Sequence, residues 1–326
     1  MSAEKVTLTD NIKTTDKSGI GIAYSKLILI GEHAVVHGQP AIAIPFPLVG
    51  VESVIKYKTG PIKFDSTFYH GAMDSAPLAL EGIVNAIHAT LKYLGLPSRD
   101  MVIQVKSSIP PGKGLGSSAS VAIAIIRSLF SYAKVDYTEG ELLHFANIAE
   151  KFAHGSPSGI DTLTITSESP VWFERENPVS YISPGEDFHF IVADSGRIGD
   201  TRSAVESVAH LLKKAPSKIQ SKIERIGELT HLAKHALEKA GKNLLGQMLN
   251  EAQKELSALG VSDEGLDRLI NFARKEGAIG AKLTGGGNGG CIIALAKNEI
   301  HSRQLSEKLK EFGAQAVWPF VLRKQD

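Results

Sequence analysis

Alternating glycines lead into a pair of serines in the segment Pro110-Pro-Gly-Lys-Gly-Leu-Gly-Ser-Ser-Ala-Ser120. The apolar run 101–105 before it predicts a strand, and the run 119–129 after it, which contains no Pro or Gly, predicts a helix. Glycines let the backbone approach a ligand closely, and a helix start offers unpaired N–H groups at the positive end of its dipole. The layout therefore predicts a phosphate-binding loop. A simple helix start with Ser117 as N-cap is the competing interpretation.

This loop differs from two common nucleotide-binding motifs. A Walker loop places Lys directly before Ser or Thr, whereas Lys113 is followed by Gly114. A dinucleotide fingerprint needs Gly-x-Gly-x-x-Gly, which the alternating glycines do not fit. The sequence thus indicates another kind of phosphate loop.

A second glycine-rich segment, Thr284-Gly-Gly-Gly-Asn-Gly-Gly290, lies between two predicted strands. Its glycines match a dinucleotide fingerprint formally, but a strand follows instead of a helix. A hairpin turn is one interpretation, although five glycines exceed what a two-residue turn needs. We favour a wall of backbone packed against the first loop or against a substrate.

Two carboxylates, Glu150 and Asp161, flank the turn-forming segment His154-Gly-Ser-Pro-Ser-Gly-Ile-Asp161. Carboxylates near a phosphate loop suit magnesium binding and base catalysis in phosphoryl transfer. Composition alone favours ordinary surface carboxylates, and the loop between the two is what singles them out.

Other candidate residues lie near the N-terminus and near residue 200. Lys26 precedes an apolar strand, where its ammonium group could reach the surface or enter a phosphate site. Glu32, His33 and His37 could hold a metal, but Ala34 stands where a zinc-protease motif requires Glu. A polar turn after the strand is the simpler interpretation. Asp200 and Thr201 are typical helix-capping residues.

The chain as a whole is that of an ordinary globular protein. Its 326 residues favour two domains, and a formal net charge of +1 gives no reason to expect nucleic acid or an acidic membrane as a partner. The single cysteine, Cys291, allows no disulfide within the chain, which suits a reducing cytoplasm. The polar start lacks an apolar signal core, and no apolar run approaches a membrane span.

The pattern of elements predicts an α/β (α+β) fold. Strands are expected at 26–30, 41–44, 49–57, 163–166 and 171–174, with a bulge or an edge where Pro45 and Pro47 interrupt them. Helices are expected from about 77 to 95 and from 138 to 152, the latter opened by a capping box of Thr138 and Glu141.

A polar stretch at 177–187 marks the expected boundary between domains 1–185 and 186–326. After it, a strand at 188–193 precedes three or four helices between 200 and 277. Strands at 281–283 and 291–295, a helix at 301–312 and a strand at 315–322 complete the chain. This order is that of a ferredoxin-like split βαβ domain with extra helices.

Four segments, taken together, resemble the GHMP kinase superfamily and, within it, the mevalonate kinase family. They are residues 23–38 with Gly31-Glu-His-Ala-Val-Val-His-Gly38, the loop 110–120, the segment from Glu150 to Asp161, and residues 284–291. They occur in family order over most of the chain. The resemblance implies a two-domain GHMP kinase fold with the active site in the cleft between the domains.

The resemblance also implies a reaction, the phosphorylation of mevalonate by ATP and Mg²⁺ in isoprenoid precursor synthesis. Asp161 matches the catalytic base and Lys26 the lysine that polarises the hydroxyl, while Ser118 and Glu150 match the magnesium ligands. The positions that match the ATP phosphate loop are Pro111, Gly112, Lys113, Gly114, Leu115, Gly116, Ser117 and Ser118. Those that match the mevalonate pocket are Glu32, His33, His154, Thr201, Gly286 and Gly287.

The chain departs from the family's motifs at two places, and two alternative functions remain open. The family often has Ala-Pro-Gly-Lys where this chain has Ala23-Tyr-Ser-Lys26, and Gly286 and Asn288 replace an alanine and a glycine of the last motif. Phosphomevalonate kinase or another small-alcohol kinase is the first alternative, and a His33/His37 metal-dependent hydrolase is the second. Because family members are frequently dimers, a homodimer is also expected.

Overall fold

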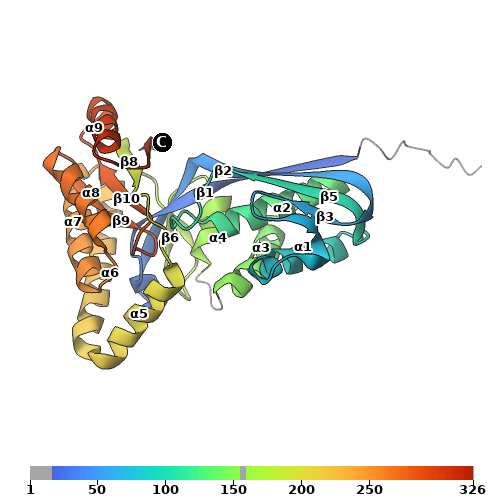
Figure 1. Ribbon diagram of the computed structural model, residues 1–326. Helices are drawn as coiled ribbons and strands as arrows, with labels where there is room; N and C mark the ends of the chain where they lie inside the picture. The colour runs from blue at the N-terminus through green and yellow to red at the C-terminus, as the bar shows by residue number, and fades with distance from the viewer. Residues whose placement is uncertain (1–16, 155–158, 326) are drawn as a thin grey trace, which may run out of the picture.

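Two β-sheets, one before and one after residue 185, organise the chain in the computed structural model, which describes residues 17–154 and 159–325. They form two lobes: β1, β2 and β5 with helices α1–α3 in one, and β8–β10 with helices α6–α9 in the other (Figure 1). The expected mixed fold is confirmed. The boundary at 185/186 falls between the sheets and stays a prediction.

The first sheet has seven strands in the order β4-β3-β5-β2-β6-β7, with β1 paired to β2. Its strands are β1 (Ser18–Ile30), β2 (Ala41–Pro61), β3 (Lys63–Asp65), β4 (His70–Ala72), β5 (Arg99–Ser107), β6 (Val171–Phe173) and β7 (Ser180–Tyr181). Where Tyr24 gives way to Ser25, the partner on β2 jumps from Gly50 to Phe46. This irregularity is the bulge predicted from Pro45 and Pro47, and β2 continues through it as one strand.

Four helices accompany this sheet: α1 (Glu81–Tyr93), α2 (Ser117–Ala133), α3 (Glu139–His154) and α4 (Ile160–Thr166). Helix α2 packs directly on β1, because a Cβ at Gly21 would lie only 2.1 Å from the Ala124 carbonyl oxygen. This close approach joins the first half of β1 to the middle of α2 and leaves no room for a side chain at Gly21. The predicted capping box is confirmed: Thr138 N donates to the Glu141 carboxylate (2.7 Å) and Glu141 N donates to Thr138 Oγ1 (3.2 Å).

Two local predictions are corrected. Ser117 is the first residue of α2 and not its cap, since Gly116 precedes it at φ 72° without a side-chain capping bond. Residues 163–166 belong to helix α4 and not to a strand. Their β-branched side chains favour strands by propensity, but here Thr164 Oγ1 donates to the Ile160 carbonyl at 2.6 Å, a bond compatible with a helix.

The second sheet is antiparallel, with the order β11-β8-β10-β9. Its strands are β8 (Phe188–Asp194), β9 (Gly280–Thr284), β10 (Cys291–Leu295) and β11 (Ala316–Leu322). Its helices are α5 (Thr201–Lys214), α6 (Pro216–Glu238), α7 (Lys242–Ala258), α8 (Glu264–Lys275) and α9 (Glu299–Glu311). The order of strands and helices confirms the split βαβ domain with extra helices.

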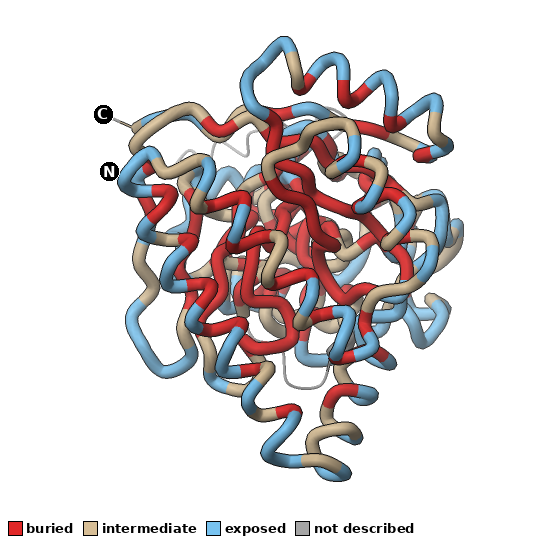
Figure 2. Tube along the Cα trace, turned by 90° about the vertical axis from the view of Figure 1, so that its left-hand side faces the viewer, coloured by how far each residue is buried: buried red, intermediate tan, exposed pale blue. Residues whose placement is uncertain are grey.

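Alternate residues of β8 face two different cores. Phe190 and Val192 join the apolar cluster of the first lobe, whereas Ile191 and Ala193 join a second cluster with α5, α6 and α8. The Phe46 and Phe320 rings, 5.3 Å apart, join the two lobes. Figure 2, which looks along the molecule from the second lobe, shows buried segments gathered in the middle of the view. The apolar cluster that contains Phe46, Phe190 and Phe320 is therefore shared by the two lobes.

None of the helices in the described ranges is both long and apolar enough to cross a membrane.

Candidate active site

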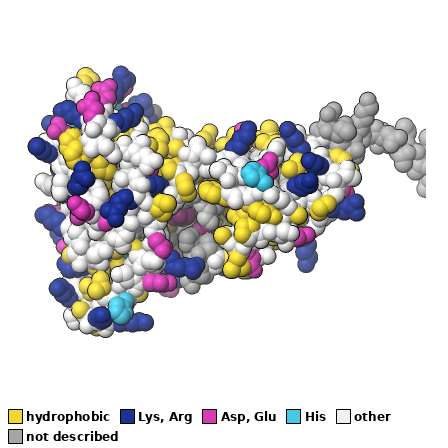
Figure 3. All heavy atoms as spheres, in the orientation of Figure 1, with side chains coloured by type: hydrophobic (Ala, Val, Ile, Leu, Met, Phe, Trp, Pro, Cys, Tyr) yellow, Lys and Arg dark blue, Asp and Glu magenta, His cyan; other side chains and the backbone are white. Residues whose placement is uncertain are grey.

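A cavity of about 680 Å³ opens between the two lobes, a size suited to a small ligand. Figure 3 shows the surface hollowed at this place. The first lobe contributes Lys26, Glu32, His33, residues 112–118, Glu150 and residues 159–162; the second contributes Thr201, Arg202, Val205, Glu206, Gly285 and Gly286. Segments far apart in the sequence thus meet in one site.

The two glycine-rich loops touch each other, as the second glycine cluster predicts. A Cβ on Gly114 would lie 3.1 Å from Gly285 Cα, and a Cβ on Gly286 would lie 2.6 Å from Thr201 Oγ1. The family's alanine at position 286 would therefore collide with Thr201 unless one of them moved. Asn288 adopts φ 52°, which Asn tolerates, so the turn keeps its shape.

Lys26 and Asp161 form an ion pair in the cleft, with Lys26 Nζ 2.8 Å from Asp161 Oδ1. The Lys26 side chain is 5% exposed and that of Asp161 is 30% exposed. Lys26 thus does not extend to the surface, and the carboxylate is the partner that a ligand can reach. The N-terminus of α4 presents Asp161, and the end of β1 presents Lys26.

Ser25 joins strand β1 to the glycine-rich loop 112–118. Its Oγ donates to the Leu115 carbonyl at 2.6 Å, and the Lys26 N–H donates to the same oxygen at 3.3 Å. The chain's departure from Ala-Pro-Gly-Lys therefore adds a side-chain contact between β1 and the loop. Sequence reasoning missed it, because a serine before a lysine carries no signal of its own.

Glu32 and His33 bind groups of the second lobe. The Glu32 carboxylate forms an ion pair with Lys282 of β9, and both side chains are buried. Burial raises the pKa of Glu32 and lowers the pKa of Lys282, while their mutual attraction opposes both shifts. Lys282 was missed by the sequence analysis, although a lysine inside the apolar strand Gly280–Thr284 is itself a signal.

His33 lies at the edge of the cleft with its Nε2 2.9 Å from the Gly286 carbonyl oxygen. A carbonyl only accepts, so Nε2 carries the proton and Nδ1 is left as an acceptor. Burial lowers the pKa of His33 to about 4, and the histidine is neutral at pH 7. Its Nδ1 is buried and has no partner among the described residues.

The metal alternative finds no support in these contacts. Glu32 and His33 are bound to Lys282 and Gly286, and the described part of the chain contains no group of three His, Cys, Asp or Glu side chains that could hold a metal. Magnesium differs, because phosphate oxygens can supply most of its ligands. Ser118 and Glu150 both line the cleft, and their oxygens are the hard donors that magnesium prefers.

The remaining predicted residues fall in three groups. Gly112, Leu115, Ser117 and Thr201 line the cleft as predicted, whereas Pro111 and Gly287 are not among the lining residues. Gly287 instead packs on Val261, whose carbonyl oxygen would lie 2.0 Å from a Cβ there. The side chain of His154 lies outside the described residues. Asp200 caps α5 by accepting from Ser203 N at 3.2 Å.

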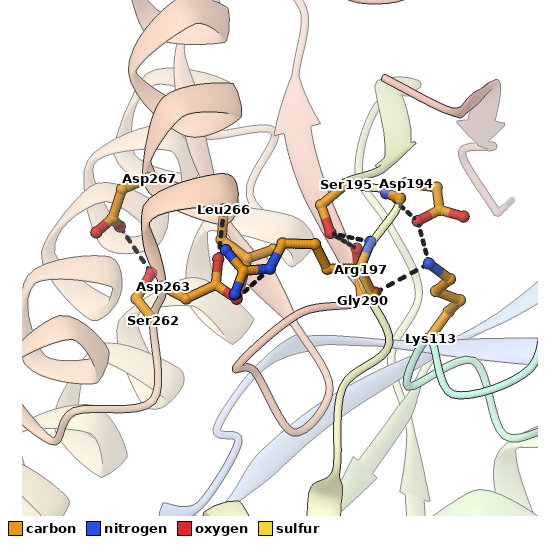
Figure 4. Close-up of polar contacts among 10 residues, drawn as sticks. Lys113, Asp194, Ser195, Arg197, Ser262, Asp263, Leu266, Asp267 and Gly290 are labelled. Carbon is orange, nitrogen blue, oxygen red and sulfur yellow. Dashed lines mark hydrogen bonds and ion pairs between the residues drawn. The ribbon is translucent and has the colours of Figure 1, made fainter. Parts of the chain in front are cut away.

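Lys113 lies in the glycine-rich loop 112–118, but its ammonium group bonds to the second lobe (Figure 4). Nζ lies 2.8 Å from Asp194 Oδ1 and 2.9 Å from the Arg197 carbonyl oxygen. Sequence reasoning had assigned Lys113 to the cofactor and had not used Asp194.

Comparison with known proteins identifies the family to which this chain is similar. The family model "GHMP kinases N terminal domain" matches residues 81–168, and "GHMP kinases C terminal" matches residues 233–315. A mevalonate kinase of Aeropyrum pernix is 35% identical over 90% of this chain and 93% of its own length.

Solved structures agree with this. A mevalonate kinase of methicillin-resistant Staphylococcus aureus is 32% identical over 93% of this chain and 98% of its own, with a TM-score of 0.71. L. major mevalonate kinase in complex with R-mevalonate, at 24% identity, shares the fold with a TM-score of 0.81 over 94% of this chain and 96% of its own.

Proposed function

This chain belongs to the GHMP kinase family, and from that premise we propose that it transfers a phosphoryl group from ATP to the primary hydroxyl of mevalonate, giving 5-phosphomevalonate for isoprenoid synthesis. One observation carries the proposal: the Lys26–Asp161 pair faces the same cleft as the glycine-rich loop and the start of α2. A phosphate donor and an acceptor hydroxyl can therefore meet there.

Asp161 is the group that accepts or orients the proton of the attacking hydroxyl. Its carboxylate is the more exposed member of the pair, so it can reach a substrate. Lys26 supplies a fixed positive charge beside the hydroxyl, where negative charge develops as phosphorus is attacked. Because the lysine is buried, that charge is little screened by water.

The loop 112–118 binds the ATP phosphates. Gly112, Gly114 and Gly116 all adopt positive φ, which exposes backbone N–H groups along a path that L side chains rarely permit. The 17-residue helix α2 begins at the end of this path, so its dipole also favours the anionic phosphates.

Ser118 and Glu150 would hold Mg²⁺ against these phosphates. The cation, when bound, neutralises charge on the transferred group. Glu150 is buried and fixed by α3, whereas Ser118 is the second residue of α2, so two helices define the site.

The acid is bound on the side of Glu32, His33, His154, Thr201 and Gly286. The neutral His33 presents Nδ1 as an acceptor for a substrate hydroxyl. Arg202 also lines the cleft, and its positive charge suits the carboxylate of mevalonate.

Phosphomevalonate is a less suitable substrate, because its phosphate would need additional cations. Of the cations that line the described cleft, Lys26 is paired with Asp161 and Lys113 with Asp194. Arg202 is the third cation in the lining of the described cleft.

A coupled assay of ADP release, run with mevalonate, phosphomevalonate, homoserine and galactose, tests the proposal. We expect turnover with mevalonate and a phosphomonoester product, identified by ³¹P NMR. Turnover with another alcohol and none with mevalonate would overturn it. Activity that survives zinc chelation, with magnesium restored, excludes a zinc hydrolase.

A homodimer and a cytoplasmic location stay predictions from the family resemblance and from the single cysteine, which is buried in β10. Light scattering after size-exclusion chromatography would measure the oligomeric state.

A further inference from the structure

The Lys113–Asp194 pair connects the glycine-rich loop to the second lobe, and both of its side chains are almost fully buried. The Lys113 side chain is 5% exposed and the Asp194 side chain is 4% exposed. Figure 4 shows Lys113 directed at Asp194, with the ammonium group also at the Arg197 carbonyl oxygen. An ammonium group held by the Asp194 carboxylate and by the Arg197 carbonyl oxygen is already engaged.

Backbone hydrogen bonds join the same segments around this pair. Gly199 N donates to the Gly112 carbonyl at 2.8 Å, and Gly290 N donates to the Arg197 carbonyl at 2.8 Å. Asp194 Oδ1 also accepts from Gly196 N at 2.8 Å. The ion pair therefore lies where the phosphate loop, the 195–199 turn and the second glycine-rich turn converge.

Backbone contacts fix the loop at Gly112 and Leu115, and the ion pair adds a side-chain contact between these two points. Its three glycines at positive φ bring large conformational freedom, which must be lost before the N–H groups can point at a phosphate. A buried contact at Lys113, between Gly112 and Gly114, restricts this freedom before the ligand arrives.

We propose that Lys113 and Asp194 act as a tether that holds the glycine-rich loop in its phosphate-binding shape, so that Lys113 is a positioning residue and not a ligand of the nucleotide. The inference rests on the proposed function only in taking the loop's ligand to be ATP. The tether also connects the two walls of the cleft, because the 195–199 turn leads directly into Thr201 and α5.

The test compares Lys113→Met, Asp194→Asn and the double variant, with Lys222→Met as matched control. Lys222 forms an ion pair with Glu255 at 3.1 Å between α6 and α7 and does not line the cleft. The readouts are the dissociation constant of a non-hydrolysable ATP analogue, hydrogen exchange of residues 110–118, the two KM values and Tm. Analogue binding needs no acceptor, so it remains measurable if mevalonate proves not to be the substrate.

Both single variants should weaken analogue binding about tenfold, within the usual 5- to 150-fold range of coupling between sites. They should speed exchange in the loop and raise KM for ATP while KM for mevalonate changes little. The double variant should be no worse than the worse single variant, because the pair acts as a unit. Lys222→Met should lower Tm without these changes.

A phosphate-binding lysine would give a different pattern. Lys113→Met would then weaken binding with normal exchange in the loop, and Asp194→Asn would leave binding unchanged or tighten it, which would overturn the tether. Should Lys113→Met fail to fold, Lys113→Arg keeps the charge and should keep nearly normal binding, whereas Asp194→Asn still reports the loss of the tether.

Discussion

Glu32 and Lys282 lie 250 residues apart, on the two sides of the cleft, and form an ion pair with both side chains buried. Two hydrogen bonds accompany it: Thr284 Oγ1 donates to the Ile28 carbonyl at 2.8 Å, and His33 Nε2 donates to the Gly286 carbonyl. The end of β1 and the residues that follow it are thus fixed to β9 and to the turn after β9, which holds the two walls of the cleft together.

Lys282→Met should destabilise the protein by about 3–5 kcal/mol, because it leaves the Glu32 carboxylate buried without its partner. The double variant Glu32→Gln/Lys282→Met should be more stable than Lys282→Met alone. Urea unfolding measures both. A double variant less stable than either single one would show that the pair is not the source of the effect.

The pH dependence of stability should report His33. The unfolded chain protonates this histidine below pH 6.5, while the folded chain does so only near pH 4, because burial lowers its pKa. The unfolded state therefore binds more protons between these values, and the free energy of unfolding falls as pH drops through this window, by up to about 3 kcal/mol. The free energy of unfolding of His33→Gln, measured over the same pH range, should lack this contribution. If the variant and the wild type show the same pH dependence, His33 is not its source.

Asp161→Asn should reduce turnover by roughly 10²–10⁴-fold while the variant still binds ATP, since a positioned base contributes about that much. Lys26→Met should also lose turnover, because it removes the charge beside the reacting hydroxyl. Steady-state kinetics and analogue binding separate chemistry from affinity. A folded Asp161→Asn enzyme with near-normal turnover would exclude Asp161 and leave Lys26 as the leading catalytic residue.

Gly114→Ala should damage ATP use more than backbone strain alone explains. A Cβ there would lie 3.1 Å from Gly285 Cα and 3.2 Å from the Thr284 carbonyl oxygen, so one loop must move. A misplacement of about 1 Å costs about 100-fold in rate, which sets the upper limit of the expected effect. Gly95→Ala is the control, with φ +63° against +74° but with nothing within 4 Å. Gly95→Ala should lower stability by about 1–2 kcal/mol without a loss of activity. Equal kinetics in the two variants would show that the contact between the two glycine-rich loops does not matter for ATP use.

Glu150→Gln should raise the magnesium concentration needed for half-maximal activity at least about tenfold, since even outer-shell partners of metals contribute that much. Magnesium titration at fixed ATP measures it. Glu141→Gln, on the same helix, is the control. It replaces the carboxylate that accepts from Thr138 N in the capping box, so it should lower stability without changing the magnesium requirement. An unchanged magnesium requirement in Glu150→Gln would remove Glu150 from the metal site.

Local sequence determined the elements that depend on neighbours along the chain. The capping box of α3, the bulge near Pro45 and the strand–loop–helix order around Ser117 follow from side-chain chemistry within a few residues, and all three are present. The strand predicted at 163–166 was wrong, because propensity alone does not reveal the hydroxyl bonds of Thr164 within a helix.

The sequence by itself predicted the chemistry: a candidate phosphate loop, a lysine and two carboxylates in family order. Only the tertiary structure decided the partners. Asp161 pairs with Lys26, Glu32 with Lys282 and Lys113 with Asp194, at separations that no local pattern encodes. The physical reason is that a buried charge requires an opposite charge beside it. The packing of the two lobes, and not the spacing along the chain, decides which side chain provides that opposite charge.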